Sequence, residues 1–364
     1  MVRALADFSD LHVYAPDQEN GALGQWDVDG VTYYAGSPVR RTQLSRIGTY
    51  PYAGRGSWSR HSTREALSIA ERLRPDIIHS EYNQTAEALL RARVNRLTAM
   101  SRTTITLHDL SWGGVFGPPP PGSNPVRRWL HDLERVKSRH TRNAIEKHVD
   151  AIFVYSERDR AKIPDASGIV EVVPVGVARP AQGWLGDRRH TAAFGGALWR
   201  SENEAAAEYL ALEVMPLVRE RLPDATLRIF GARPTNRVTA LGSEAGVTVV
   251  GPVADYEEEF RRASVTLAPS MFDAGVFLKA IRPMAMGCPV VLNPASAIPI
   301  QGLENGVHAL VGHRPAEFAE CVVQAMRNPD DARRLGSAAK DLVQQHYSWQ
   351  RAADRYLSVF NRTL

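Results

Sequence analysis

Residues 284–292 read Met-Ala-Met-Gly-Cys-Pro-Val-Val-Leu and end in a short apolar run rich in β-branched residues, Pro289–Leu292. Similar runs recur along the chain and alternate with longer stretches of helical character. This alternation is typical of βα units wound around parallel sheets. The sequence therefore predicts an α/β protein.

The runs form two successive groups, separated by Gly176–His190, a segment rich in Gly, Pro and Arg that shows no periodicity. The expected strands are Leu11–Ala15, Val31–Ala35, Asp76–His79, Thr103–Leu107, Ala151–Tyr155 and Val170–Val173, followed by Thr191–Phe194, Thr226–Phe230, Val247–Val250, Val265–Ala268, Pro289–Leu292 and Ala309–Val311. The expected helices are Ser62–Leu73, Gln84–Arg96, Val126–His148, Glu202–Leu222, Tyr256–Ala263, Pro315–Arg327 and Asp330–Tyr347.

A chain of 364 residues, 44% of them hydrophobic, suits two globular domains better than one. We expect a first domain over residues 1–182 and a second over residues 183–346, with residues 347–364 forming a terminal helix. Two parallel-sheet domains in succession place a ligand in a cleft outside the carboxyl ends of their strands. Candidate site residues should therefore follow strands.

The beginning of the chain departs from this pattern. Residues 1–7 are typical of the end of a helix, and the first strand is already Leu11–Ala15. A doubly wound domain normally opens with a central strand and a phosphate-sized glycine turn. Two explanations stay open: the true start lies upstream of Met1, or the first sheet has a gap.

Composition excludes several classes of protein. No run of about 18 apolar residues is present to span a membrane, and residues 1–7 lack the apolar stretch of a secretory signal. The cysteines, Cys288 and Cys321, are too few for a disulfide framework and fit buried thiols in a reducing cytoplasm. The net charge is +4, and no basic run is interleaved with aromatic residues, so we expect no nucleic-acid partner. A weak attraction to an anionic membrane face stays open.

Six motifs in a fixed order connect the second half of the chain with a known family. They are Asp150–Arg160, Val173–Val177 (Val-Pro-Val-Gly-Val), Phe194–Gly196 (Phe-Gly-Gly), Leu227–Thr235, Val250–Val253 and Met284–Val291. Over roughly residues 150–360 the chain resembles the family 4 glycosyltransferases. The resemblance implies the GT-B fold, which has two Rossmann-like domains facing a central cleft. The second domain would bind a nucleotide-sugar, and the terminal helix would cross back to the first.

The resemblance also implies site residues. His108 corresponds to the histidine that lies against the donor sugar in relatives, and it is our candidate catalytic residue; Asp109 follows it, and His79 ends an earlier strand. For both histidines the alternative is a structural role at a strand terminus. In the second domain, Gly195 and Gly196 would allow close approach of the backbone to the ligand, unless they only form a tight turn. Arg233 and Val253 would border the nucleotide base.

The family's paired glutamates are missing. Their positions, eight residues apart, fall on Ala274 and Arg282. In relatives the second glutamate accepts hydrogen bonds from the ribose, and its loss should cost about 1.5–3 kcal/mol, or roughly tenfold to 150-fold in donor affinity. The family's basic pair is altered as well. Ala197 stands for the arginine and Asn203 for the lysine, which leaves Arg200 as the nearest cation.

Other residues still favour an anion site. Asp273, Ala274, Gly275 and Val276 form an open turn whose amides would meet a phosphate, together with Gly196. Lys279 and Arg282 follow near the start of a helix, where cations are disfavoured by up to about 1 kcal/mol unless an anion is bound. The alternative is that both side chains extend into solvent. Pro283 predicts that the helix begins near Arg282 or kinks there.

We expect a retaining, metal-independent hexosyltransferase that needs no cofactor. Its donor would be a nucleotide-sugar, and its acceptor a glycan of polysaccharide biosynthesis, a lipid-linked saccharide or a small natural product. Lys279 and Arg200 would hold the diphosphate, His108 would position the sugar, and Arg282 would replace the ribose-binding acid. The expected location is cytoplasmic, with peripheral contact to the inner membrane face left open. The alternative is a catalytically degenerate GT-B protein that binds a ligand or partner. A phosphorylase of similar fold lacks any visible cofactor-lysine motif.

Overall fold

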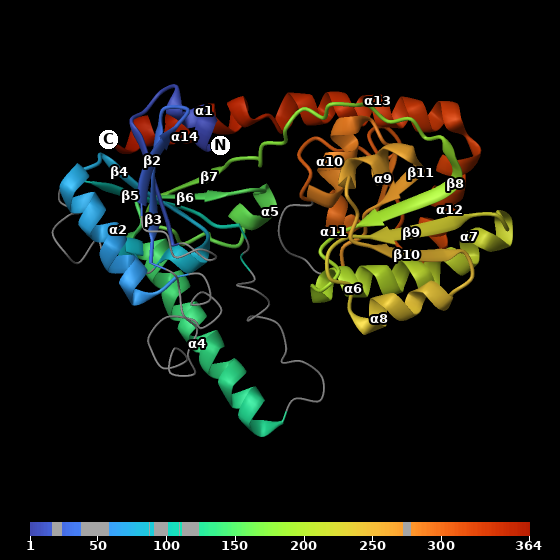
Figure 1. Ribbon diagram of the computed structural model, residues 1–364, viewed down its shortest axis with the longest axis horizontal. Coiled ribbons are helices and arrows are strands. Elements are labelled where there is room, and N and C mark those ends of the chain that lie inside the picture. Colours follow the sequence, from blue (N-terminus) through green and yellow to red (C-terminus); the bar gives the residue numbers. More distant parts are fainter. Residues whose placement is uncertain are drawn as a thin grey trace. The chain divides into compact units, whose positions relative to one another are not determined.

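The computed structural model describes residues 1–16, 24–37, 58–86, 88–90, 101–108, 110, 124–271 and 278–364. The chain forms two compact units (Figure 1). Unit 1 comprises Met1–Pro174 together with Trp349–Leu364, and unit 2 comprises Val175–Ser348. The division falls after Pro174, earlier than the predicted boundary at residue 182.

Unit 2 is built on a six-stranded sheet in which every pair of neighbouring strands is parallel. The strands are β8 (Arg188–Gly195), β9 (Thr226–Phe230), β10 (Val247–Gly251), β11 (Ala263–Leu267), β12 (Val290–Leu292) and β13 (Leu310–Val311). Their order is β10-β9-β8-β11-β12-β13, the Rossmann order 3-2-1-4-5-6 counted from β8. The strand order reverses between β8 and β11, so the carboxyl ends of these two strands border the expected ligand position.

Helices cover both faces of this sheet, which explains why consecutive residues of its central strands are buried (Figure 1). Ala192 and Phe194 of β8 pack into a core with one set of helices, whereas Ala193 packs into a core on the other face. The first set is α6 (Ser201–Glu208), the π-helix η5 (Tyr209–Val214), α7 (Met215–Arg221), α8 (Asn236–Ala240) and α12 (Pro315–Arg327). The other face is covered by α9 (Tyr256–Arg262), α10 (Leu278–Met286) and α13 (Pro329–His346).

Unit 1 contains two separate sheets among its described residues. The larger is parallel, in the order β4 (Ile77–Glu81), β5 (Arg102–Thr106), β6 (Ala151–Val154) and β7 (Ile169–Val172). The smaller contains β1 (Leu11–Pro16), β3 (Val31–Gly36) and β2 (Gly24–Val28). The sequence analysis missed β2, which pairs antiparallel with β3. Asp29 and Gly30 connect the two strands with positive φ angles of 52° and 75°, as a type I′ hairpin turn requires.

Helices also cover the larger sheet on both faces. On β6, Ile152 and Val154 pack with Ile145 of α4 (Pro125–His148). The alternate residues Ala151 and Phe153 pack with α14 (Trp349–Thr363) and with Leu5 of α1 (Val2–Ala6). The terminal helix α14 is therefore part of the core of unit 1. Its side chains at that core are Ala352, Ala353, Tyr356 and Val359.

The predicted helix Gln84–Arg96 lies largely outside the described residues; its described part contains the end of the 3-10 helix η3 (Asn83–Thr85) and helical residues at 86 and 88–90. Of the two outcomes predicted from Pro283, a helix start near Arg282 is wrong, because α10 spans Leu278–Met286 and contains Pro283 in its interior. The other outcome, a kink at this position, stays a prediction. Among the helices of the described residues, none is long and apolar enough to cross a membrane.

Candidate functional site

The carboxyl end of β8 is packed too tightly for side chains. A Cβ on Gly195 would lie 2.6 Å from atoms of Phe230 and from the hydroxyl of Tyr256, and a Cβ on Gly196 would lie 3.0 Å from the amide of Asn203. Gly231, which follows β9, has a φ of 137°, and a Cβ there would lie 1.8 Å from the carbonyl oxygen of Gly196. Neighbouring protein atoms therefore favour glycine at positions 195 and 231, whether or not a ligand also approaches, and leave little room for a side chain at position 196.

Asn203 and Lys279 meet beside this strand end. The Lys279 Nζ donates a hydrogen bond to Asn203 Oδ1 at 3.2 Å, and Asn203 Nδ2 donates to the carbonyl oxygen of Ala197 at 3.1 Å. The same ammonium lies 5.6 Å from the centre of the Phe194 ring. The structure thus brings Lys279, Asn203 and Gly196 together at the point where the strand order reverses.

The environment of Lys279 disfavours its charged form. Burial lowers the pKa of Lys279 to about 8; Glu202 opposes this shift and Arg200 adds to it. Arg200 itself forms an ion pair with Glu202, and its side chain is about half exposed. An anion bound beside Lys279 would return the pKa towards its ordinary value. The site therefore has the electrostatic character of an anion site.

Arg282 lies three residues further along α10 and is exposed to solvent. Burial raises the pKa of Tyr256 to about 12, and the charge of Arg282 opposes that shift, which places the guanidinium within electrostatic range of the Tyr256 hydroxyl. This hydroxyl also borders Gly195. The predicted phosphate turn, Asp273, Ala274, Gly275 and Val276, lies outside the described residues.

Arg233 stacks on an aromatic ring that the sequence analysis did not single out. The Arg233 guanidinium carbon lies 4.7 Å from the ring centre of Trp199, whose side chain is 51% exposed. Arg233 has a φ of 49°, a conformation that few residues other than glycine adopt. Val253, which follows β10, packs against the core that contains Phe230. Trp199 and Arg233 therefore form an exposed cation–π pair beyond the ends of β8 and β9.

A second polar cluster lies in unit 1, where β4, β5 and β6 end. His108 Nε2 donates a hydrogen bond to Glu81 Oε2 at 2.6 Å. The Tyr155 hydroxyl lies 3.2 Å from His108 Nδ1 and 3.0 Å from Nε2. The ring of Tyr82 stacks on the imidazole with 3.7 Å between the ring centres. Asp109, the other candidate at this strand end, lies outside the described residues.

The pKa values of Glu81 and Tyr155 in this cluster are strongly shifted. Burial alone would raise the pKa of Glu81, but hydrogen bonds from His108 and His79 lower it to about 2. Burial raises the pKa of Tyr155, and the Glu81 carboxylate raises it further. Tyr82 has a φ of 69°, an outlier for a bulky residue, and its amide donates to the Thr106 carbonyl oxygen at 3.0 Å. Glu81 is therefore an anion that fixes the neighbouring imidazole.

His79 has a different environment from His108. Its Nδ1 lies 2.8 Å from Thr104 Oγ1, and its Nε2 lies 3.1 Å from Thr106 Oγ1 and 3.4 Å from Glu81 Oε1. Its ring also contacts the aromatic rings of Phe153, Tyr356 and Phe360. Both ring nitrogens therefore have partners, and His79 lies one layer behind the Glu81–His108 pair.

Sequence reasoning identified His108 but missed Glu81, Tyr82 and Tyr155. Each of the three lies at or just after a predicted strand, so the rule that sites follow strands was a sufficient signal. That rule did not show that these strands are neighbours in the order β4-β5-β6, which brings their ends together. Among the described residues, no group of three or more His, Cys, Asp or Glu side chains is arranged to hold a metal ion.

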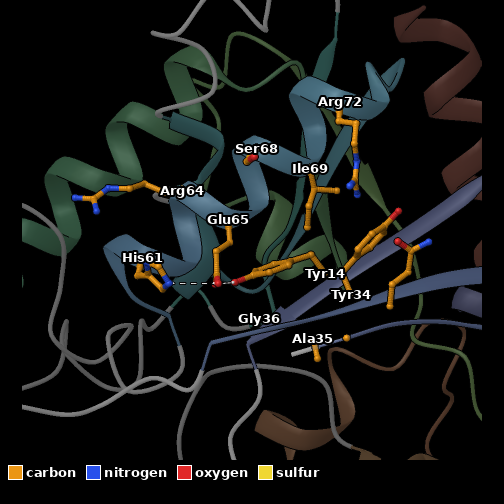
Figure 2. Close-up of a pocket in the computed structure, with 12 residues that line it drawn as sticks. Tyr14, Tyr34, Ala35, Gly36, His61, Arg64, Glu65, Ser68, Ile69 and Arg72 are labelled. Carbon is orange, nitrogen blue, oxygen red and sulfur yellow. Dashed lines mark hydrogen bonds and ion pairs between the residues drawn. The ribbon is translucent and has the colours of Figure 1, made fainter. Parts of the chain in front are cut away.

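A separate pocket of about 530 Å³ lies in unit 1 between α2 (Arg60–Leu73) and the strands β1 and β3 (Figure 2). Glu65 accepts hydrogen bonds from the hydroxyls of Tyr14 and Ser37, both at 2.8 Å, and lies 3.3 Å from His61 Nε2. Hydrogen bonds from Ser37 and Tyr14 lower the pKa of Glu65, although burial opposes the shift. This carboxylate connects α2 with both strands, which gives it a structural role.

Comparison with known proteins gives a family match within unit 2. Residues 189–328 match the family model described as Glycosyl transferases group 1. The D-inositol 3-phosphate glycosyltransferase of Streptomyces coelicolor is 32% identical over 106 residues, which cover 29% of this chain. The chain spans only 23% of the length of that relative.

Solved structures extend the likeness to nearly the whole chain. Sucrose-phosphate synthase from Thermosynechococcus elongatus has a TM-score of 0.74 at 16% identity, covering 99% of this chain and 91% of its own. The Anabaena protein HepE, in complex with UDP and glucose, has a TM-score of 0.64 at 13% identity. The match covers 91% of this chain and 86% of HepE. At these identities the likeness concerns the fold, which is the GT-B fold predicted from the sequence.

Proposed function

We propose that this chain, whose residues 189–328 match the family model described as Glycosyl transferases group 1, transfers a sugar from a nucleotide-sugar to an acceptor hydroxyl. The proposal depends most on one observation: Lys279 and Asn203 meet where the strand order of a Rossmann-type sheet reverses. Ligands of such sheets bind at that point. The match of residues 189–328 to a glycosyltransferase family supports the same activity.

Lys279 would bind the diphosphate of the donor. Asn203 Oδ1 accepts a hydrogen bond from its ammonium and so helps to orient it. Arg200 would contribute a second, more exposed charge, and amides of the Ala274–Val276 turn would complete the clamp. A low-dielectric setting strengthens such contacts, which is consistent with the lowered pKa of Lys279.

The nucleoside would lie towards Trp199, Arg233 and Val253. A flat, half-exposed indole backed by a guanidinium offers a stacking surface for a base. Arg282 would take the place of the ribose-binding acid of relatives. UDP is bound in HepE, and we propose a uridine nucleotide as the first donor to test for this chain.

The transfer would retain the anomeric configuration, with no metal or other cofactor. The acceptor oxygen would attack the anomeric carbon on the face that the diphosphate leaves, and a leaving phosphate oxygen would take the hydroxyl proton. Such a reaction depends on positioning and on charge stabilisation of the leaving group. His108 would contact the donor sugar; Tyr155, which is shared between both ring nitrogens, is the partner that a sugar hydroxyl would displace.

A donor-hydrolysis screen across nucleotide-sugars, followed by calorimetry with the matching nucleoside diphosphate, tests this function. We expect release of the nucleoside diphosphate and the free sugar from at least one donor. Lys279→Met should weaken binding of the diphosphate by roughly tenfold to 150-fold, the loss expected for a hydrogen bond to a charged group. Lys340→Met is the matched control, because Lys340 is also half-buried in unit 2 but lies on α13. No stabilisation by any nucleoside diphosphate at millimolar concentration would contradict the proposal.

A further inference from the structure

A continuous series of side-chain contacts connects the terminal helix with His108. The Tyr356 hydroxyl of α14 lies 2.7 Å from Thr106 Oγ1, which lies 3.1 Å from His79 Nε2. His79 Nε2 lies 3.4 Å from Glu81 Oε1, and Glu81 Oε2 accepts the 2.6 Å hydrogen bond from His108. We call the series Tyr356, Thr106, His79 and Glu81 the relay.

The strand register explains why these residues meet. His79 pairs with Thr104 and Glu81 pairs with Thr106 across the parallel β4–β5 ladder. Residues two apart on a strand lie on the same face, so the relay runs along one face of the sheet. His79 contacts the rings of Tyr356 and Phe360, which places α14 on that same face.

Burial leaves the relay few other partners. Thr104 and Thr106 are fully buried, and Tyr356 is 2% exposed. Buried polar groups of this kind are almost always hydrogen-bonded, and here they satisfy one another. If the Nε2 of His79 carries its proton, it donates towards Glu81 and Thr106, while Nδ1 accepts from the Thr104 hydroxyl. Each member then has one consistent orientation, and Glu81 is fixed from the side opposite His108.

We infer that His79 and Tyr356 are positioning residues that act through Glu81 to hold the imidazole of His108 in one orientation. Only the use of His108 in catalysis rests on the proposed function; the orientation of the ring does not. Among the described residues, the phenol of Tyr155 and the α-amino group of Met1 also face Glu81. Neither belongs to the relay, and Tyr356→Phe keeps the aromatic ring next to Tyr155.

The test uses variants that remove one relay contact each. Tyr356→Phe removes only the hydroxyl. His79→Asn keeps an amide near the position of Nδ1 and loses the contact that Nε2 makes with Glu81. His79→Gln places an amide nitrogen near the position of Nε2 and should restore that contact. Tyr347→Phe is the matched control, because Tyr347 is also 2% exposed and its hydroxyl accepts one hydrogen bond, from the Gln301 amide at 2.7 Å.

The first readout is the pair of ring ¹⁵N signals of His108 in the full chain without ligand. We expect the hydrogen-bonded Nε2–H signal in wild type, Tyr347→Phe and His79→Gln, and its loss or averaging in Tyr356→Phe and His79→Asn. The second readout is donor turnover, for which we expect kcat to fall by about two- to tenfold in the latter two variants, with KM for the donor unchanged.

The inference is overturned if Tyr356→Phe and His79→Asn keep the wild-type ¹⁵N signals of His108. It is also overturned if their kcat matches that of Tyr347→Phe at equal thermal stability. Failure of the proposed function would appear differently, as absence of turnover in the wild-type protein. The ¹⁵N experiment does not depend on turnover, so it then still decides whether the relay orients His108.

Discussion

Lys279 Nζ donates a 3.2 Å hydrogen bond to Oδ1 of Asn203, although 76 residues separate the two along the chain. Asn203 is a neutral amide, and burial lowers the pKa of Lys279 to about 8. An anion that binds beside this side chain would raise its pKa again. The first prediction therefore concerns the protonation of Lys279 when a ligand binds.

Binding of a nucleoside diphosphate at pH 8 should be accompanied by proton uptake. About half of the Lys279 side chains are neutral at that pH, and a bound anion raises the pKa, so uptake should approach about half a proton. Calorimetry in buffers of different ionisation enthalpy measures it. In Lys279→Arg the guanidinium is always charged, so the uptake should disappear. Equal uptake in both proteins would show that another group titrates.

Arg282→Gln should weaken binding of the preferred nucleoside diphosphate by roughly tenfold, because it removes the charged group proposed to take the place of the ribose-binding acid. Arg333→Gln serves as control. Arg333 is also exposed in unit 2, carries the same charge and forms an ion pair with Asp330 of its own helix. Titration calorimetry compares the two. Equal binding by Arg282→Gln and Arg333→Gln would mean that Arg282 does not hold the ligand.

Glu81 should stabilise unit 1 in a pH-dependent way. Its pKa is lowered from 4.5 to about 2, so its stabilising contribution is complete above pH 4.5 and is lost as the pH falls towards 2. Glu81→Gln should therefore unfold more easily by about 1–3 kcal/mol at pH 7, and the difference should shrink at acid pH. Urea unfolding at several pH values, with the exposed Glu71→Gln as control, measures this. A stability difference between wild type and Glu81→Gln that stays constant with pH would contradict the lowered pKa of Glu81.

Gly195→Ala should destabilise unit 2 by about 1–3 kcal/mol even without ligand, because the new methyl group would lie 2.6 Å from Phe230 and Tyr256. Gly242→Ala is a suitable comparison, since the nearest atom to its Cβ would be 3.9 Å away. Thermal unfolding of both variants distinguishes the two roles of Gly195. Unchanged stability would indicate that the glycine serves only ligand approach.

The sequence predicted the buried strands best. All six strands of unit 2 lie where apolar runs placed them, because most residues of strands that are covered on both faces are buried. The strand β2 escaped prediction because every one of its residues is exposed. Its only signal was the Asp29–Gly30 turn, a local pattern rather than an apolar run. The start of α10 was misplaced because Pro283 is tolerated inside the helix.

By itself, the sequence determined the α/β architecture and the GT-B resemblance, because apolar runs and motif order are properties of the chain, and it predicted Lys279, Asn203 and His108 as site residues. Only the tertiary structure decided that Glu81 holds His108 and that Arg233 stacks on Trp199. These contacts depend on strand order and side-chain packing between segments distant in sequence. Hydrophobic burial determines where strands form, whereas the side chains that meet at their ends are known only once the sheet is assembled.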